Sequence, residues 1–117
     1  MVEKFEEKEH NKLVRLLGDY LKENGYEIKL DNITEFASAK PDMIAKKDKE
    51  ILSIEVVNGT SINNTKTKGK WEALSSNQKS EFCVFVTKEK LEEVKNLLEK
   101  WAIYYKKIWL YDPSLTA

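Results

Sequence analysis

Residues 41–57 constrain the fold of this chain most strongly, because two β-prone runs flank a short polar turn there. With Asp48 and Lys49 as a two-residue loop, the segment folds back on itself as a β-hairpin. Asp42 then lies opposite Glu55, and directly opposed residues of an antiparallel pair have Cβ atoms about 4.5–5.5 Å apart. The sequence therefore predicts two carboxylates that face each other at the open end of a hairpin.

Two opposed carboxylates repel each other, so the pair is costly unless something binds between them. A divalent cation would convert the repulsion into affinity, because Mg²⁺ prefers one or two carboxylates together with water and phosphate oxygens. The hairpin is therefore a candidate metal site for phosphodiester chemistry. In the alternative interpretation, Asp42 only begins a strand and Glu55 is a solvated residue on an edge.

The alternation of apolar residues supports this register, since a slip by one residue would send Asp42 and Glu55 to opposite faces. One face, which can be buried, is predicted to hold Met43, Ala45, Leu52, Ile54 and Val56. The other face is predicted to hold Asp42, Ser53, Glu55 and Val57, with Ile44 and Ile51 among them.

The chain has 117 residues, which predicts a single domain over residues 1–117 with one hydrophobic core. Its formal net charge is zero, so overall charge does not indicate a nucleic-acid-binding protein, although a local basic patch still could. The single cysteine, Cys83, rules out an intramolecular disulfide. It lies in the apolar run 82–86, where we expect a buried and unreactive thiol.

Targeting signals are not recognisable in the sequence. Met1 is followed by a polar, charged stretch rather than a signal peptide, and no apolar run is long enough to cross a membrane. We therefore expect an intracellular, cytoplasmic protein without a membrane partner.

The remaining elements follow from periodicity and from turn residues. The expected order is a helix over 5–24, a strand over 26–30, the hairpin, a helix over 66–78, a strand over 81–87, a helix over 89–104 and a strand over 107–111. Residues 31–40 are expected to be irregular, and residues 58–64 to form a polar loop. This α-β-β-β-α-β-α-β order predicts an α/β fold, with a mixed central sheet flanked by helices.

The element order resembles that of the PD-(D/E)XK nuclease superfamily, whose domains have a restriction-endonuclease-like fold. The relevant residues are Pro41 and Asp42, which open one strand, and Glu55, which lies late in the next. The lead-in also resembles small archaeal Holliday-junction resolvases, because a helix and a Gly25-Tyr26 break precede the Pro-Asp strand. The resemblance extends over nearly the whole chain in topology, but it rests on few residues.

The resemblance implies a role for each matching residue. Asp42 and Glu55 match the ligands of a catalytic Mg²⁺ or Mn²⁺, and the Val56 carbonyl would complete the metal site. In this superfamily, a lysine two positions after the second acid orients or polarises the attacking water, but this chain has Val57 there. Valine carries no charge and donates no hydrogen bond. Either the lysine has moved in the sequence, or nuclease activity has been lost.

A relocated lysine is available in the segment 65–71, which follows the Glu55 strand through a short loop. Lys70 is the first candidate and Lys68 the second. Each of them could instead be a solvated residue of a basic loop, and together these lysines could contact phosphates. Trp71 could stack on a base, but we expect it to anchor its helix in the core, and we expect Trp101 and Trp109 to be core residues.

The first helix offers two further candidates. His10 lies on the apolar stripe of that helix, where it could point toward the carboxylates and act as a metal ligand or a base. A histidine in such a position is more often a structural residue with a satisfied hydrogen bond. Glu9 is the alternative metal ligand from this helix.

Two functional hypotheses follow. In the first, the chain is a metal-dependent DNA endonuclease or resolvase-like phosphodiesterase that acts on duplex or branched DNA, with a homodimer as its active form. In the second, it is a catalytically degenerate relative that serves as a nucleic-acid-binding or protein-interaction module. A third interpretation is a small α/β domain in which the two hairpin carboxylates share no function.

Overall fold

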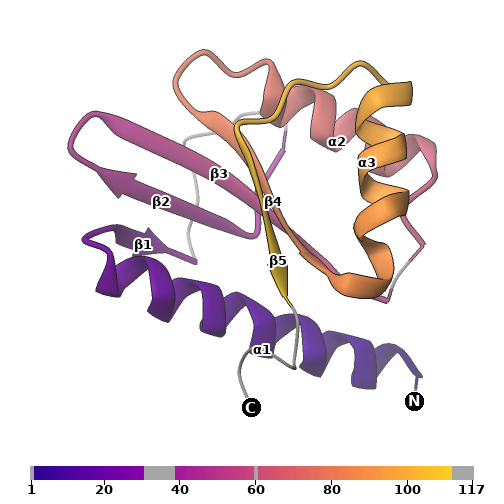
Figure 1. Cartoon of the computed structure of the whole chain (residues 1–117), viewed down its shortest axis with the longest axis horizontal. Helices are drawn as coiled ribbons and strands as arrows, with labels where there is room; N and C mark the ends of the chain where they lie inside the picture. The colour runs from indigo at the N-terminus through magenta and orange to yellow at the C-terminus, as the bar shows by residue number, and fades with distance from the viewer. Residues whose placement is uncertain (1, 31–38, 60, 112–117) are drawn as a thin grey trace.

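A computed structural model describes residues 2–30, 39–59 and 61–111, with side chains from residue 9 onward. Within these residues the chain forms an α/β fold, in which three α-helices pack on a five-stranded mixed sheet (Figure 1). The elements are α1 (Val2–Glu23), β1 (Glu27–Lys29), β2 (Met43–Lys47), β3 (Glu50–Val57), α2 (Thr65–Ser75), β4 (Glu81–Thr87), a 3₁₀ turn (Lys88–Lys90), α3 (Leu91–Lys100) and β5 (Lys107–Tyr111). The predicted α-β-β-β-α-β-α-β order is confirmed.

The strands lie in the order β1-β2-β3-β4-β5. The pairs β1–β2 and β2–β3 are antiparallel, whereas β3–β4 and β4–β5 are parallel. The parallel pairs are joined by α2 and α3, since a parallel connection needs a crossover. As a result, the carboxyl ends of β3, β4 and β5 lie at the same end of the sheet.

The hairpin has the register that the sequence predicts. Lys47 pairs with Glu50 and Met43 pairs with Ile54, so the loop is Asp48-Lys49. Asp48 has a φ of 54°, a left-handed conformation that aspartate tolerates better than most residues. The open end of the hairpin therefore brings Asp42 opposite Glu55.

The two faces of the sheet bury separate apolar clusters, as the alternation in the hairpin predicts. Helix α1 covers one face, and α2 and α3 cover the other (Figure 1). The α1 side buries Leu13, Val14, Leu17, Leu21, Met43, Ala45, Leu52, Ile54, Val56, Cys83 and Phe85. The opposite side buries Ile44, Val57, Ile62, Trp71, Leu74, Phe82, Val84, Val86, Val94, Leu97, Leu98 and Ile103.

Several element ends differ from the sequence prediction. The second helix ends at Ser75 rather than at residue 78, and the third helix covers Leu91–Lys100 rather than 89–104. Ala102, with a φ of 53°, ends the third helix in the left-handed conformation that is common just after a helix. The first strand is shorter than expected, and most of the irregular segment 31–40 lies outside the described residues.

Two of the expected core tryptophans are only partly buried. Trp101 and Trp109 lie at the margins of the two apolar clusters, whereas Trp71 is fully enclosed. Trp101 packs edge-on against Trp71, with 5.7 Å between ring centroids. Trp109 lies on β5, one of the two edge strands of the sheet, where fewer neighbours can cover it.

Among the described helices, none combines the length and the apolar character that crossing a lipid bilayer requires.

Candidate functional site

Asp42 and Glu55 meet at the end of the sheet where β2 begins and β3 ends. The N–H of Asp42 donates a hydrogen bond to Oε2 of Glu55 at 3.0 Å. The N–H of Val56 donates to Oδ2 of Asp42 at 2.8 Å. Each carboxylate is therefore fixed by the main chain of the neighbouring strand, and the two side chains converge as the register predicts.

Helix α2 brings an ammonium group to this pair. Its first turn is capped by Asn64, whose Oδ1 accepts a hydrogen bond from the N–H of Thr67 at 2.8 Å. Its buried side chains are Trp71 and Leu74, which fix the rotation of the helix against the sheet. In this orientation Nζ of Lys70 lies 3.0 Å from Oε1 of Glu55.

His10 approaches the same site from α1, on the other side of Asp42. Its Nε2 lies 3.2 Å from Oδ2 of Asp42, the oxygen that also accepts the Val56 N–H. The histidine on the apolar stripe thus has a carboxylate partner at the edge of the core. This contact links α1 to the open end of the hairpin.

A cavity of about 330 Å³ opens beside these groups. His10, Asp42, Glu55 and Lys70 contribute to its wall. The rest of the wall comes from the end of β3, the loop before α2 and the first turns of α2, namely Val56, Val57, Ser61, Ile62, Asn64, Lys66, Thr67 and Trp71. A cavity that combines acidic, basic and hydroxyl groups can accept a polar, charged ligand.

Glu55 is under electrostatic strain because its side chain is almost fully buried. Burial and the nearby Asp42 carboxylate raise the pKa of Glu55 to about 8, although the Lys70 ammonium and the Asp42 N–H act in the opposite direction. The Lys70 ammonium therefore offsets only part of the cost of burying a charge on Glu55. With a pKa of about 8 this carboxyl is mostly protonated at neutral pH, so a cation that binds there must displace the proton.

Asp42, in contact with His10, is more strongly ionised than Glu55. Burial acts to raise the pKa of Asp42, but hydrogen bonds from His10 and from the Val56 N–H outweigh it and hold that pKa below its ordinary value. The hydrogen bond to Asp42 raises the pKa of His10 against the opposing effect of burial. The histidine therefore helps to keep Asp42 negatively charged.

The donor chemistry fits a hard, oxygen-binding divalent cation such as Mg²⁺ or Mn²⁺ better than zinc. Within the described part of the chain, no group of three or more His, Cys, Asp and Glu side chains is arranged to hold a metal ion. Zinc sites usually use three or four such ligands, whereas Mg²⁺ is often held by one or two carboxylates and completes its shell with water and phosphate oxygens. Two converging carboxylates satisfy the second pattern.

The other candidate residues are placed differently. Val57 is buried and lines the cavity, so the usual lysine position does face the site. Glu9 is exposed, Lys68 is half-buried, and neither lines the cavity. Val56 lines the cavity, and its N–H binds Asp42.

Sequence reasoning missed the contribution of the loop before α2 and of the first turn of that helix. Ser61 and Asn64 from the loop and Thr67 from the helix bring hydroxyl and amide groups to the cavity. Asn64 was detectable as a helix cap, because an asparagine three residues before Thr67 and directly before a helix is a typical start signal. Ser61 carries no such signal, since its position depends on the path of the loop.

Comparison of the chain with protein-family models, with curated protein sequences and with solved structures finds no significant match. The class of site is therefore defined by its own geometry. It is a pair of carboxylates, one buried and one partly buried, with an ammonium and an imidazole in contact, at the end of two inner strands of an α/β protein.

Proposed function

We propose that this chain is a metal-dependent DNA endonuclease or resolvase-like phosphodiesterase with a restriction-endonuclease-like fold. The observation that carries the proposal is the position of Lys70, whose Nζ lies 3.0 Å from Glu55 in the cavity that Val57 also lines. The α2 ammonium thus lies in the same cavity as position 57, where the PD-(D/E)XK pattern has its lysine, and this supports Lys70 as the relocated lysine. The resemblance and the geometry support the same site.

In this proposal Asp42 and Glu55, with the Val56 carbonyl, hold Mg²⁺ or Mn²⁺. When bound, the ion supplies Lewis-acid chemistry and lowers the pKa of a coordinated water. Lys70 stabilises negative charge on the phosphate that enters the cavity, because the contact with Glu55 already positions its ammonium there. Lys66 lies on the same wall and provides a second phosphate contact.

His10 acts in this proposal as a positioning residue rather than as a metal ligand. It contacts Oδ2 of Asp42, which the Val56 N–H also binds, so it fixes the orientation of that carboxylate. Orienting partners behind a ligand typically tune metal affinity without touching the ion. The active form is a homodimer in this proposal, since a domain of this size reaches both strands of a duplex most readily as a pair.

The second candidate function is a catalytically degenerate relative that binds nucleic acid or a protein partner. The observation that favours it is that both oxygens of Glu55 have partners, Oε1 in Lys70 and Oε2 in the Asp42 N–H. A site partly neutralised by its own lysine has less need of a metal ion. The zero net charge of the chain is also compatible with this alternative.

Calorimetric titration with Mg²⁺ and with Mn²⁺ tests the proposal, together with cleavage of linear and branched DNA. The variants are Asp42→Asn, which keeps the shape of the side chain, and Asp19→Asn, which removes an exposed carboxylate elsewhere on α1. We expect wild type and Asp19→Asn to bind the metal and cleave, and Asp42→Asn to lose both properties. Metal binding without cleavage would favour the degenerate relative, and no metal binding by wild type would overturn the metal-dependent mechanism.

A further inference from the structure

A second cavity, of about 590 Å³, lies on the other side of the His10–Asp42 contact. Its wall comes from one face of α1, from the residue after β1 and from the segment that leads into β2. The lining residues are His10, Asn11, Val14, Arg15, Leu30, Lys40, Pro41 and Asp42. Because His10 and Asp42 also line the first cavity, the two cavities share a wall at the proposed active site.

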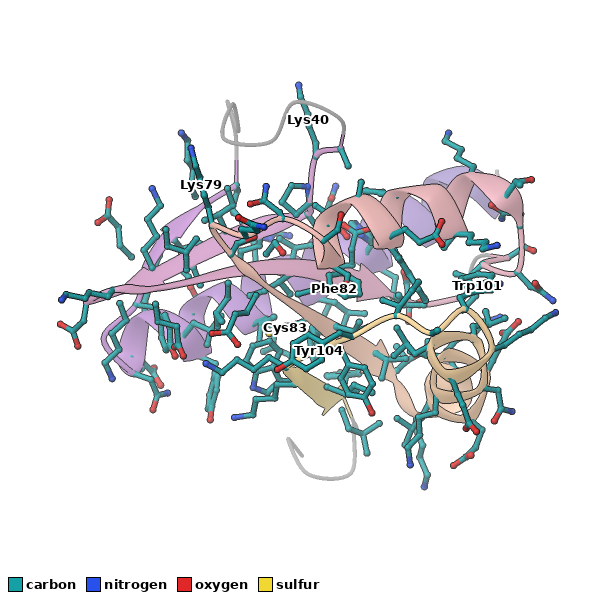
Figure 2. All side chains as sticks on the ribbon, turned by 90° about the horizontal axis from the view of Figure 1, so that it is seen from above. Lys40, Lys79, Phe82, Cys83, Trp101 and Tyr104 are labelled. Carbon is teal, nitrogen blue, oxygen red and sulfur yellow. The ribbon has the colours of Figure 1, made fainter. Side chains whose placement is uncertain are left out.

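The second cavity is basic. Arg15 and Lys40 are exposed on its wall, and in the part of the chain that the structure describes neither forms an ion pair with an acidic side chain. Lys40 projects away from the body of the protein (Figure 2). Arg15 is the only arginine in the sequence, and a guanidinium can bind a phosphate through two parallel hydrogen bonds.

A nucleic-acid strand has a phosphate at every nucleotide, so a strand with one phosphate beside Asp42 and Glu55 must continue on both sides. Lys66 and Lys70 lie on the wall of the first cavity, and Arg15 and Lys40 on the wall of the second. These two basic pairs flank the point that the cavities share. Leu30, whose side chain is exposed, adds apolar surface to the second cavity that can pack against a sugar or a base.

We propose that the second cavity is a subsite for the DNA nucleotide next to the cleaved phosphate, with Arg15 and Lys40 bound to the phosphates of that part of the strand. The proposal rests on the proposed nuclease function and specifies how its substrate is held. The DNA strand crosses the His10–Asp42 contact from one cavity to the other. Arg15 and Lys40 are therefore substrate-binding residues outside the metal site.

The first test is the salt dependence of DNA binding, measured by fluorescence anisotropy with labelled oligonucleotides in EDTA, so that no cleavage occurs. The variants are Arg15→Gln and Lys40→Gln, with Lys95→Gln on α3 as a matched control that removes one exposed positive charge from the opposite face of the sheet. We expect each of the two cavity variants to weaken binding about tenfold. Each should also reduce the slope of log K against log salt by about one, and the control should do neither.

A second test locates the contact on the strand. A neutral methylphosphonate is substituted for one phosphate at a time along the oligonucleotide, and binding by wild type and Arg15→Gln is compared. We expect one methylphosphonate, next to the cleavage position, to weaken DNA binding by wild type about as much as the Arg15→Gln substitution does. The same methylphosphonate should leave DNA binding by Arg15→Gln unchanged. Such non-additivity is the signature of two groups in direct contact.

The outcomes separate this inference from the function on which it rests. If wild type cleaves DNA but Arg15→Gln and Lys40→Gln behave like Lys95→Gln, the subsite is overturned and the nuclease function stands. If the two variants bind DNA less tightly while wild type cleaves no substrate, the subsite stands as part of a binding module. If wild type neither binds DNA in EDTA nor cleaves it with Mg²⁺ or Mn²⁺, both proposals are overturned together.

Discussion

Asp42 and Glu55 are each bound by the main chain of the other's strand. The Asp42 N–H donates to Oε2 of Glu55 at 3.0 Å, and the N–H of Val56, which follows Glu55, donates to Oδ2 of Asp42 at 2.8 Å. Two carboxyl groups are thus held close together by main-chain hydrogen bonds, because the hairpin register places them opposite each other. A preorganised acidic pair of this kind does not have to reorganise when a cation arrives.

The role of Lys70 is tested by Lys70→Met, with Lys68→Met as the matched control on the same helix. We expect Lys70→Met to lower kcat for DNA cleavage by about 10²- to 10³-fold, since removal of one preorganised donor to a transition-state charge has effects of that size. Lys68 does not line the cavity, so its variant should stay within about twofold of wild type. Steady-state cleavage rates measure kcat for both variants. An equal decrease of kcat in Lys70→Met and Lys68→Met would show that only the general positive charge of the helix matters.

The position of Val57 predicts a partial rescue. Its side chain lines the cavity that Lys70 also lines, so the ammonium of a lysine at position 57 would extend into the same cavity. We expect Val57→Lys to restore part of the cleavage activity when it is introduced into Lys70→Met. The substitution also places a charge in a buried position, and we expect it to lower the free energy of unfolding by about 1–3 kcal/mol. Thermal unfolding and cleavage assays on the double variant measure the two effects separately.

If the double variant is folded and as inactive as Lys70→Met, an ammonium at position 57 cannot replace the one from α2. Val57→Met is the control for side-chain length, because it extends the side chain without adding charge.

A network of ion pairs at the opposite end of the hairpin predicts a pH dependence of stability. Glu50 accepts hydrogen bonds from Lys106 and Tyr26, and these contacts lower the pKa of Glu50 from its ordinary value of 4.5. The same contact with Glu50 raises the pKa of Lys106 to about 12. Lowering the pKa of an acid stabilises the folded state above the unfolded pKa, and raising the pKa of a base stabilises it below the unfolded pKa.

We therefore expect Glu50→Gln to lower Tm by about 2 °C between about pH 5 and pH 10, because exposed ion pairs contribute little. The difference from wild type should shrink as the pH falls through the lowered pKa of Glu50, and again as it rises toward the raised pKa of Lys106. Glu99→Gln, at an exposed position on α3, is the control. A Tm difference that does not vary with pH would show that Glu50 acts through packing alone.

The buried cysteine predicts a lack of reactivity. Cys83 lies in the middle of β4 without exposed surface, and burial raises the pKa of its thiol to about 12. Since the thiolate is the reactive form, we expect no reaction with a thiol reagent in the native state and full reaction in denaturant. Absorbance of the released chromophore measures both, and rapid labelling of native protein would contradict the buried position.

The hairpin and its two carboxylates were predictable because the signal lies within the segment itself. Alternation over residues 43–57 specifies which residues share a face, and the turn Asp48-Lys49 specifies the register. These local rules fix Asp42 opposite Glu55 without any knowledge of the rest of the chain. The structure agrees with both predictions at this point.

The choice between Lys68 and Lys70 depended on tertiary structure. Trp71 and Leu74 define the buried stripe of α2, and at about 100° per residue the two lysines lie on opposite flanks of that stripe. Only the position of the carboxyl end of β3 determines which flank faces the carboxylates. Similarly, whether His10 reaches Asp42 depends on where α1 lies along the sheet, which periodicity does not specify.

Lys70 and Trp71 are neighbours in sequence, and this has a consequence for how the protein tolerates change. The indole is 1% exposed and packs on Phe82 and Trp101, so its packing determines how far the adjacent ammonium extends toward Glu55. A substitution at Phe82, which packs on the indole and does not line the cavity, would shift the reach of the lysine without altering any polar group. Selection for the activity of such a protein would therefore also act on the shape of its hydrophobic interior.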